Sequence, residues 1–197
     1  MIQRQWATID PIFNVTDRYL ACNNPGVPPP SYIPIRAGEN ITAVYWYWLH
    51  PIGPMTVWLA RCEQSTTTTT STPGDGGNMK EKWQDIDCAS ADVNQVRWFK
   101  IWEAGLLDGP NMAEGMWYQK AFQRWDNSPA LWPVKIPGNL RSGLYMVRHE
   151  ILSLHVAKKP QFYPECAHLN VTGGGEVTVP ENYLVKFPGV YAVDGEC

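Results

Sequence analysis

Apolar and aromatic residues gather into short runs along this chain, and stretches rich in Pro, Gly and Asn separate them. One run extends from Ile41 to Leu49 after a Gly-centred turn, and a second extends from Met55 to Cys62. Both are dense in β-branched and aromatic residues, which favour strands. We therefore predict two consecutive strands, with His50 in the loop that joins them.

Similar runs continue towards the C-terminus. The stretch "VRWFKIWEAGL" predicts another strand, "WPVKIPGNLRSGLYMVRHEILSLHV" predicts strand, turn and strand, and "HLNVTGGGEVTVP" predicts a further strand and turn. The stretch "NMAEGMWYQKAFQRW" predicts either a short helix or an ordered loop. About seven short strands at this spacing are typical of a β-sandwich.

Composition supports an all-β fold with long loops and at most short helices. Aromatic residues make up 12% of the chain, which also holds 17 Pro and 16 Gly, and helices disfavour this mixture. A length of 197 residues suits one domain, so we treat residues 1–197 as a single unit. The polar, low-complexity segment 63–80 cannot bury a core, and we predict a flexible loop insertion there.

Charge and hydropathy argue against two classes of partner. The formal charge is −3 and no Lys/Arg cluster exceeds a pair, so a nucleic-acid surface is not indicated. No run of about eighteen apolar residues predicts a membrane span. The first residues, "MIQRQWATID", lack the apolar region of a secretory signal. Three sequons predict glycosylation at Asn14, Asn40 and Asn170.

The five cysteines show no CxxC spacing, which disfavours a structural zinc site. Two disulfides with one thiol left over fit better, and we pair Cys22 with Cys166 and Cys62 with Cys88. The alternative is a set of scattered buried thiols in a cytosolic protein. If the bridges form, the protein is extracellular and its signal peptide is not part of this sequence.

The stretch "HEILSLHVAKKPQFYPEC", residues 149–166, holds the most suggestive polar side chains. On one strand, His149 and His155 would share a face but lie about 20 Å apart at roughly 3.3 Å per residue, too far to share one metal ion. Gln161 and Tyr163 point to one side of an extended segment, and the intervening turn could fold Tyr163 beside His155. The alternative is that these are ordinary half-buried residues at strand ends.

Several motifs together carry a family resemblance. The stretches "LHPIGPMTVWLARC", "YMVRHEILSLH", "QFYPEC" and "KFPGVY" resemble the fungal lytic polysaccharide monooxygenases of auxiliary activity family nine, formerly glycoside hydrolase family sixty-one. The resemblance implies an immunoglobulin-like or fibronectin-like β-sandwich, secretion, a monomer and an external electron donor. It also implies one copper ion on a flat face that oxidises polysaccharide, typically the β-1,4-glucan chains of cellulose.

The resemblance assigns roles to residues that match the family's motifs. His50 looks like the internal copper ligand, and Tyr163 looks like the axial residue beneath the copper. His155 and Gln161 look like the pair that hydrogen-bonds oxygen at the metal, which would affect rate more than copper affinity. His149 looks like a structural strand histidine.

Two further assignments come from the same resemblance. Cys22 and Cys166 match the family's bridging pair. Tyr191 resembles an aromatic residue on the substrate-facing surface, with ordinary packing as the alternative.

One family requirement is not met by this sequence. The family's copper is held by a histidine brace that includes an N-terminal histidine, whereas the four histidines here are at positions 50, 149, 155 and 168. We expect either a chain that lacks its N-terminal strand and C-terminal loop or a divergent member without the brace. With His50 and an axial phenol alone, copper would have too few strong donors, and this polypeptide would be inactive or poor.

Two other functions compete with copper-dependent oxidation. One is a catalytically silent polysaccharide-binding or cell-wall protein on the same sandwich. The other is a glycoside hydrolase with paired carboxylates, which is disfavoured. Glu150 lies in a predicted strand, and the remaining candidates lie in a loop without a motif, namely Asp85, Asp87 and Asp92.

Overall fold

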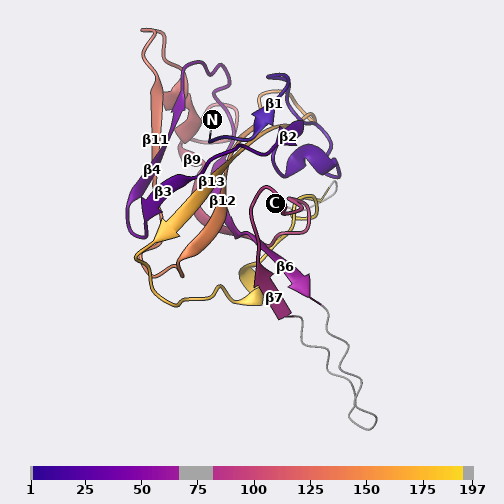
Figure 1. Ribbon diagram of the computed structural model, residues 1–197. Coiled ribbons are helices and arrows are strands. Elements are labelled where there is room, and N and C mark those ends of the chain that lie inside the picture. The colour runs from indigo at the N-terminus through magenta and orange to yellow at the C-terminus, as the bar shows by residue number, and fades with distance from the viewer. Residues whose placement is uncertain (1, 67–81, 193–197) are drawn as a thin grey trace.

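A computed structural model describes residues 2–66 and 82–192 of the chain. The described residues form strands, loops and three short 3-10 helices, so the predicted all-β class is confirmed (Figure 1). The longest of these helices, η2 (Tyr118–Phe122), lies in the stretch for which a short helix or an ordered loop was predicted.

The centre of the fold is a five-stranded sheet in the order β3-β13-β12-β5-β8. Its strands are β3 (Ile33–Arg36), β5 (Met55–Arg61), β8 (Trp98–Ala104), β12 (Gly143–Ser153) and β13 (Gln161–Thr172). All neighbours are antiparallel except β13 and β3. The strands β12 and β13 pair over eleven residues, from Gly143 opposite Val171 to Ser153 opposite Gln161.

A two-stranded layer packs against one face of this sheet. Its strands are β4 (Asn40–Tyr45) and β11 (Ala130–Lys135), in which buried and more exposed positions alternate. Alternation places every second side chain on the inner face. Inner residues such as Ile41 and Trp132 therefore share a core with Val147 and Ile151 of β12, which gives a sandwich.

Loops cover the other face of the central sheet and enclose a second core. This core contains Trp98, Met146, Phe162 and Phe187 together with the four bridged cysteines. Both predicted disulfides are confirmed. Cys22–Cys166 joins the N-terminal segment to β13, and Cys62–Cys88 joins residues 26 apart in the sequence.

Two predicted element boundaries were wrong. The strand β4 ends at Tyr45 instead of Leu49, because Trp48 turns into the core and its indole donates to Gln119. The segment 63–80 does not begin as a flexible loop, because β6 (Glu63–Thr66) pairs with β7 (Lys82–Asp85). Residues 67–80 of the predicted insertion lie outside the described residues.

The remaining elements are short. They are η1 (Arg18–Leu20), η3 (Glu181–Tyr183), β1 (Gln5–Trp6), β2 (Pro25–Val27), β9 (Leu106–Asp108) and β10 (Met116–Trp117). No helix within residues 2–66 and 82–192 is long and apolar enough to cross a membrane.

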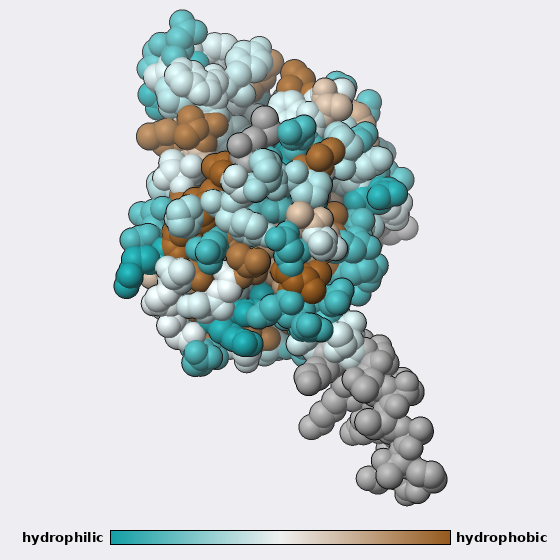
Figure 2. All heavy atoms as spheres, in the orientation of Figure 1, coloured by the Kyte–Doolittle hydropathy of each residue, from teal (hydrophilic) through white to brown (hydrophobic). Residues whose placement is uncertain are grey.

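Polar residues dominate the visible surface, with apolar patches between them (Figure 2). Val44 and Leu131 face each other across β4 and β11 and are both exposed. Asn14, Asn40 and Asn170 are also exposed, so their side chains are accessible to the predicted glycosylation.

Candidate functional site

The end of the sandwich where β12 finishes and β13 begins brings four predicted residues together. The loop that carries His50 runs beside the end of β12, because the Leu152 amide donates to the Pro54 carbonyl at 3.0 Å and the Leu154 amide donates to the Ile52 carbonyl at 2.8 Å. Backbone pairing therefore continues beyond the strand and places His50 next to the β12–β13 turn.

The four side chains contact one another directly. Nε2 of His50 lies 2.9 Å from the hydroxyl of Tyr163, and that hydroxyl donates to Oε1 of Gln161 at 2.9 Å. The imidazole rings of His50 and His155 are stacked, with centroids 4.3 Å apart and planes 16° from parallel. The predicted residues thus form one cluster, although they come from two separate segments of the chain.

Two residues that the sequence reasoning did not single out support this cluster. The ring of Trp48 packs edge-on against His50 at 5.1 Å and against Tyr163 at 5.0 Å. Its indole nitrogen donates to Oε1 of Gln119 at 3.2 Å. The side chain of Gln119 is fully buried, and its amide nitrogen donates to the carbonyls of Gly53 and Leu152.

These bonds connect the His50 loop, helix η2 and the end of β12 through one buried amide. The aromatic run that ends at His50 was a visible signal for Trp48. Nothing in the sequence around Gln119 indicates that its side chain points inward.

Burial keeps two members of the cluster, His50 and Tyr163, neutral near pH 7. Burial, and then the neighbouring His155, lower the pKa of His50. Burial, with a smaller effect of Asp10, raises the pKa of Tyr163 to about 12. An uncharged imidazole with an available lone pair is the form that binds a metal ion or accepts a hydrogen bond.

The other two histidines lie elsewhere. His149 is buried, with its ring centroid 4.9 Å from that of Trp132, and burial lowers its pKa to about 4. His168 is buried beside Arg4, whose Nε donates to the imidazole Nε2 at 3.2 Å. Both side chains belong to the packed interior, as the resemblance implies for His149.

Tyr191 does not lie on the face expected for it. Its ring packs 5.2 Å from Phe162 and 5.9 Å from Phe187, and its hydroxyl donates to the buried carboxylate of Glu150. Because Phe162 and Tyr163 are consecutive in β13, they point to opposite faces of the sheet. The second core therefore holds Tyr191 on the far side of the sheet from Tyr163.

Other aromatic side chains are exposed near the cluster. Trp46 and Tyr47 precede His50 and are 69% and 71% exposed. Trp125 is 77% exposed and follows Gln123, whose side-chain amide donates to the Leu49 carbonyl. The loop that carries Trp125 thus lies against the loop that carries His50.

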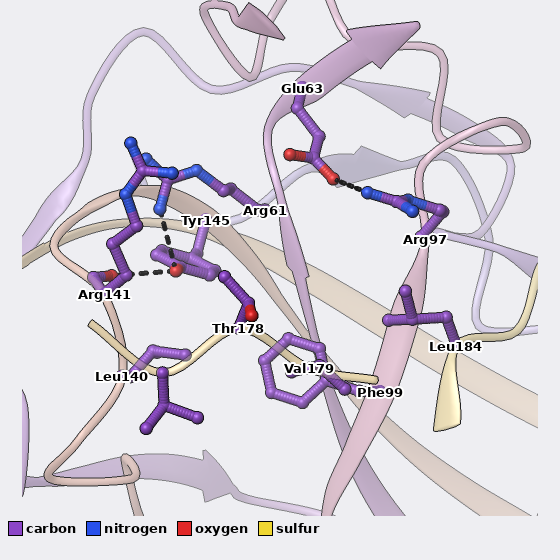
Figure 3. A pocket seen from close by; sticks show the side chains of 11 residues that line it. Arg61, Glu63, Arg97, Phe99, Leu140, Arg141, Tyr145, Thr178, Val179 and Leu184 are labelled. Carbon is purple, nitrogen blue, oxygen red and sulfur yellow. Dashed lines mark hydrogen bonds and ion pairs between the residues drawn. The ribbon is translucent and has the colours of Figure 1, made fainter. Parts of the chain in front are cut away.

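A pocket at the opposite end of the sheet contains none of the predicted site residues (Figure 3). Arg61, Arg97, Arg141 and Glu63 line its rim, above the side chains of Phe99 and Leu140. Arg61 forms two bonds to Asp85, at 2.6 and 2.7 Å. Arg97 contacts Glu63 at 2.6 Å and Glu181 at 2.5 Å.

The candidate site meets only part of what a copper ion requires. His50 offers one imidazole nitrogen and Tyr163 one phenol oxygen. The lone pairs of an imidazole lie in its ring plane, so the stacked ring of His155 cannot share an ion with His50. Within the described part of the chain, no group of three or more His, Cys, Asp or Glu residues could hold a metal ion. These donors alone are too few for tight copper binding.

Known proteins provide an independent comparison. Residues 1–83 and 78–196 match the profile of Auxiliary Activity family 9 (formerly GH61). The chain is 38% identical over 195 residues to AA9 family lytic polysaccharide monooxygenase B of Heterobasidion irregulare, covering 98% of this chain and 69% of that protein. It is 40% identical over 195 residues to the monooxygenase-like protein CEL1 of Agaricus bisporus, covering 97% of this chain and 52% of that protein.

A solved structure extends the likeness to three dimensions. The chain is similar to the crystal structure of a cellulose-active polysaccharide monooxygenase from M. thermophila, with a TM-score of 0.80 and 32% identity. The match covers 99% of this chain and 77% of that one.

Proposed function

Because the chain belongs to Auxiliary Activity family 9, we propose that the protein acts on polysaccharide and cleaves its chains oxidatively at the end of the sandwich that holds His50. The observation that carries the proposal is the contact between Nε2 of His50 and the hydroxyl of Tyr163 at 2.9 Å. The family motifs assign to these two side chains the roles of internal copper ligand and of phenol beside the ion.

Copper is the cofactor in this proposal, and when bound it would supply the redox chemistry. His50 would hold it together with donors that the described residues do not provide. Tyr163 would lie beside the ion and limit access to it, because its hydroxyl is 2.9 Å from Nε2 of His50. His155 and Gln161 would orient an oxygen atom beside the site by hydrogen bonding.

Cellulose is the proposed substrate. One structural relative is described as cellulose-active. Sugar rings stack on exposed aromatic faces, and Trp46, Tyr47 and Trp125 provide such faces beside the His50 loop in place of Tyr191. The two disulfides and three exposed sequons support an extracellular location and glycosylation.

A second function is favoured by one observation. The donor set within the described residues is too small for copper, while the exposed aromatic side chains remain. Such a protein would bind polysaccharide without cleaving it.

One experiment separates the two functions. The protein is incubated with cellulose, copper and ascorbate, and bound protein and soluble oxidised oligosaccharides are both measured. Oxidised products that disappear in His50→Ala support the monooxygenase. Binding without oxidised products supports the silent binder, and absence of both contradicts both functions.

The aromatic contribution is tested in the same assay. Trp125→Ala should weaken binding to cellulose about tenfold, as expected for loss of an aromatic stacking contact. Tyr183→Ala is a matched control, because Tyr183 is similarly exposed but lies on η3. Equal effects of the two substitutions would contradict a specific role for Trp125.

A further inference from the structure

Ser153, the last residue of β12, contacts the candidate site through a single bond. Its side chain is fully buried, and its hydroxyl oxygen lies 2.6 Å from Nδ1 of His155. Neither atom has another hydrogen-bond partner within residues 2–66 and 82–192. This serine therefore interacts with the cluster only through His155.

Burial determines which atom donates in this bond. A serine hydroxyl carries one hydrogen, and buried donors of this kind are nearly always satisfied. The only acceptor within reach in the described structure is Nδ1 of His155. The hydroxyl therefore donates and Nδ1 accepts, which leaves the ring proton of the neutral imidazole on Nε2.

The same bond restricts the orientation of the ring. Stacking on His50 fixes the plane of the His155 ring, and the bond at Nδ1 fixes its rotation within that plane. Nε2 of His155 has no hydrogen-bond partner within the described residues, and the His155 side chain is exposed. The ring thus presents one N–H donor next to His50.

We propose that Ser153 is a positioning residue, which holds His155 in the tautomer protonated on Nε2 and directs this donor towards an oxygen atom bound beside His50. The functional part of the inference rests on the proposed function, in which that oxygen belongs to the polysaccharide or the oxidant. The tautomer itself is a property of the folded chain and does not depend on catalysis.

Nitrogen NMR of the imidazole rings tests this assignment directly. The full chain is labelled with ¹⁵N, kept free of metal by a chelator, and measured at about pH 8, where histidine rings are neutral. The His155 signals are identified by their loss in His155→Gln. We expect His155 to be protonated on Nε2 and to accept at Nδ1.

Three substitutions complete the test. Ser153→Ala should shift the tautomer ratio about tenfold towards the Nδ1-protonated form, the effect of losing one hydrogen bond. Ser153→Thr keeps a hydroxyl in a residue that strands favour and should restore the original spectrum. Ser142→Ala, directly before the first residue of β12, should leave the His155 signals unchanged. Protonation of Nδ1 in the native protein, or identical spectra for native protein and Ser153→Ala, would overturn the proposal.

Activity provides a separate readout. In the cellulose assay, Ser153→Ala should lower kcat about tenfold with little change in KM, because the donor acts on a bound oxygen and not on polysaccharide binding. An unchanged kcat would overturn the positioning role. If the native protein forms no oxidised products, the proposed function fails while the NMR result still decides the tautomer.

Discussion

The two ends of the central sheet hold polar side chains in opposite states. At the end where β12 finishes, burial favours the neutral forms of His50 and Tyr163, and Nε2 of His155 has no partner within the described residues. At the other end, Arg61 and Arg97 are bonded to carboxylates of the same chain. Both ends are rich in polar atoms, but the first combines a ring nitrogen that has no partner in the described structure with exposed aromatic side chains.

The difference shows that, in this fold, polar groups bonded to one another have a structural role, whereas a polar group without a partner can bind a ligand. Charged groups that are bonded to one another hold loops onto the sheet, and their bonded atoms are not available to a ligand. At the same end of the sheet, the guanidinium carbon of Arg97 lies 3.7 Å from the ring centroid of Trp83, and this contact further restricts the arginine side chain. A site needs groups that are fixed in place yet incompletely satisfied, as His155 is.

The largest expected effect comes from removing the imidazole of His50, at the end of the sheet where β12 finishes. His50→Ala should lower the release of oxidised oligosaccharides at least about 100-fold, since loss of a group that only supports a metal ligand already costs 10- to 100-fold. Its melting temperature should change little because the side chain is only partly buried. A variant that keeps native activity would show that the two ends do not differ in function.

Removing the buried side-chain amide of Gln119 should affect both stability and activity. Gln119→Leu leaves the indole of Trp48 and the carbonyls of Gly53 and Leu152 without their partner, so the free energy of unfolding should fall by about 2–3 kcal/mol. Activity should fall with it because Trp48 packs on His50. Denaturant titration measures the loss, and Gln95→Leu, at an exposed loop position, is the control.

A histidine away from both ends should control part of the pH dependence of stability. The pKa of His149 is lowered to about 4, so between roughly pH 6.5 and 4 the unfolded chain binds a proton that the folded chain does not. The contribution of His149 to stability should therefore fall as pH falls through this window, and remain level below it.

Denaturant titrations of native protein and His149→Phe at pH 7 and pH 4.5 isolate this contribution. Burial also lowers the pKa of His168 to about 4, with the same sign, whereas burial raises that of Glu165 to about 7, with the opposite sign. His168 and Glu165 both remain in His149→Phe. The fall in the free energy of unfolding between pH 7 and pH 4.5 therefore differs between native protein and variant only by the contribution of His149. We expect the fall to be smaller in the variant by roughly 2 kcal/mol. Equal falls would contradict the neutral buried state.

The smallest expected effect lies at the end of the sheet where Arg61 is bonded to Asp85. Arg61→Gln should reduce the free energy of unfolding by about 1 kcal/mol, because its partner Asp85 is largely exposed. Cellulose oxidation should remain at the native level. Lys100→Gln is the matched control, since the exposed pair of Lys100 and Glu103 should contribute less than about 0.5 kcal/mol. Lost activity in Arg61→Gln would assign a function to this end.

Much of the fold could be predicted because its signals are local or match family motifs. Alternation along β4 and β11 reflects burial of one face, whereas β5 and β12 are buried along most of their length because both faces are covered. The pairings of Cys22 with Cys166 and Cys62 with Cys88 were confirmed. The motif residues His50 and Tyr163 lie within bonding distance.

The parts that were not predicted depend on packing between distant segments. Gln119 bonds to Trp48 across 71 positions of sequence, and no periodic pattern encodes that meeting. Tyr191 was assigned to a surface by its motif, but Phe162 and Phe187 draw its ring into the second core. The strand β6 was hidden by polar composition, and its Glu63 is partly buried against Arg97.

Paramagnetic NMR tests the location of the site most directly. Substoichiometric Cu²⁺ is added to the ¹⁵N-labelled protein, and line broadening is followed at each histidine and along both ends of the sheet. We predict the strongest broadening at His50, His155 and Tyr163, weaker broadening at His149, which is a diagonal neighbour of Tyr163 in the sheet, and none at the residues around Arg61. Broadening centred on the Arg61 end or on the interior histidines would contradict this location.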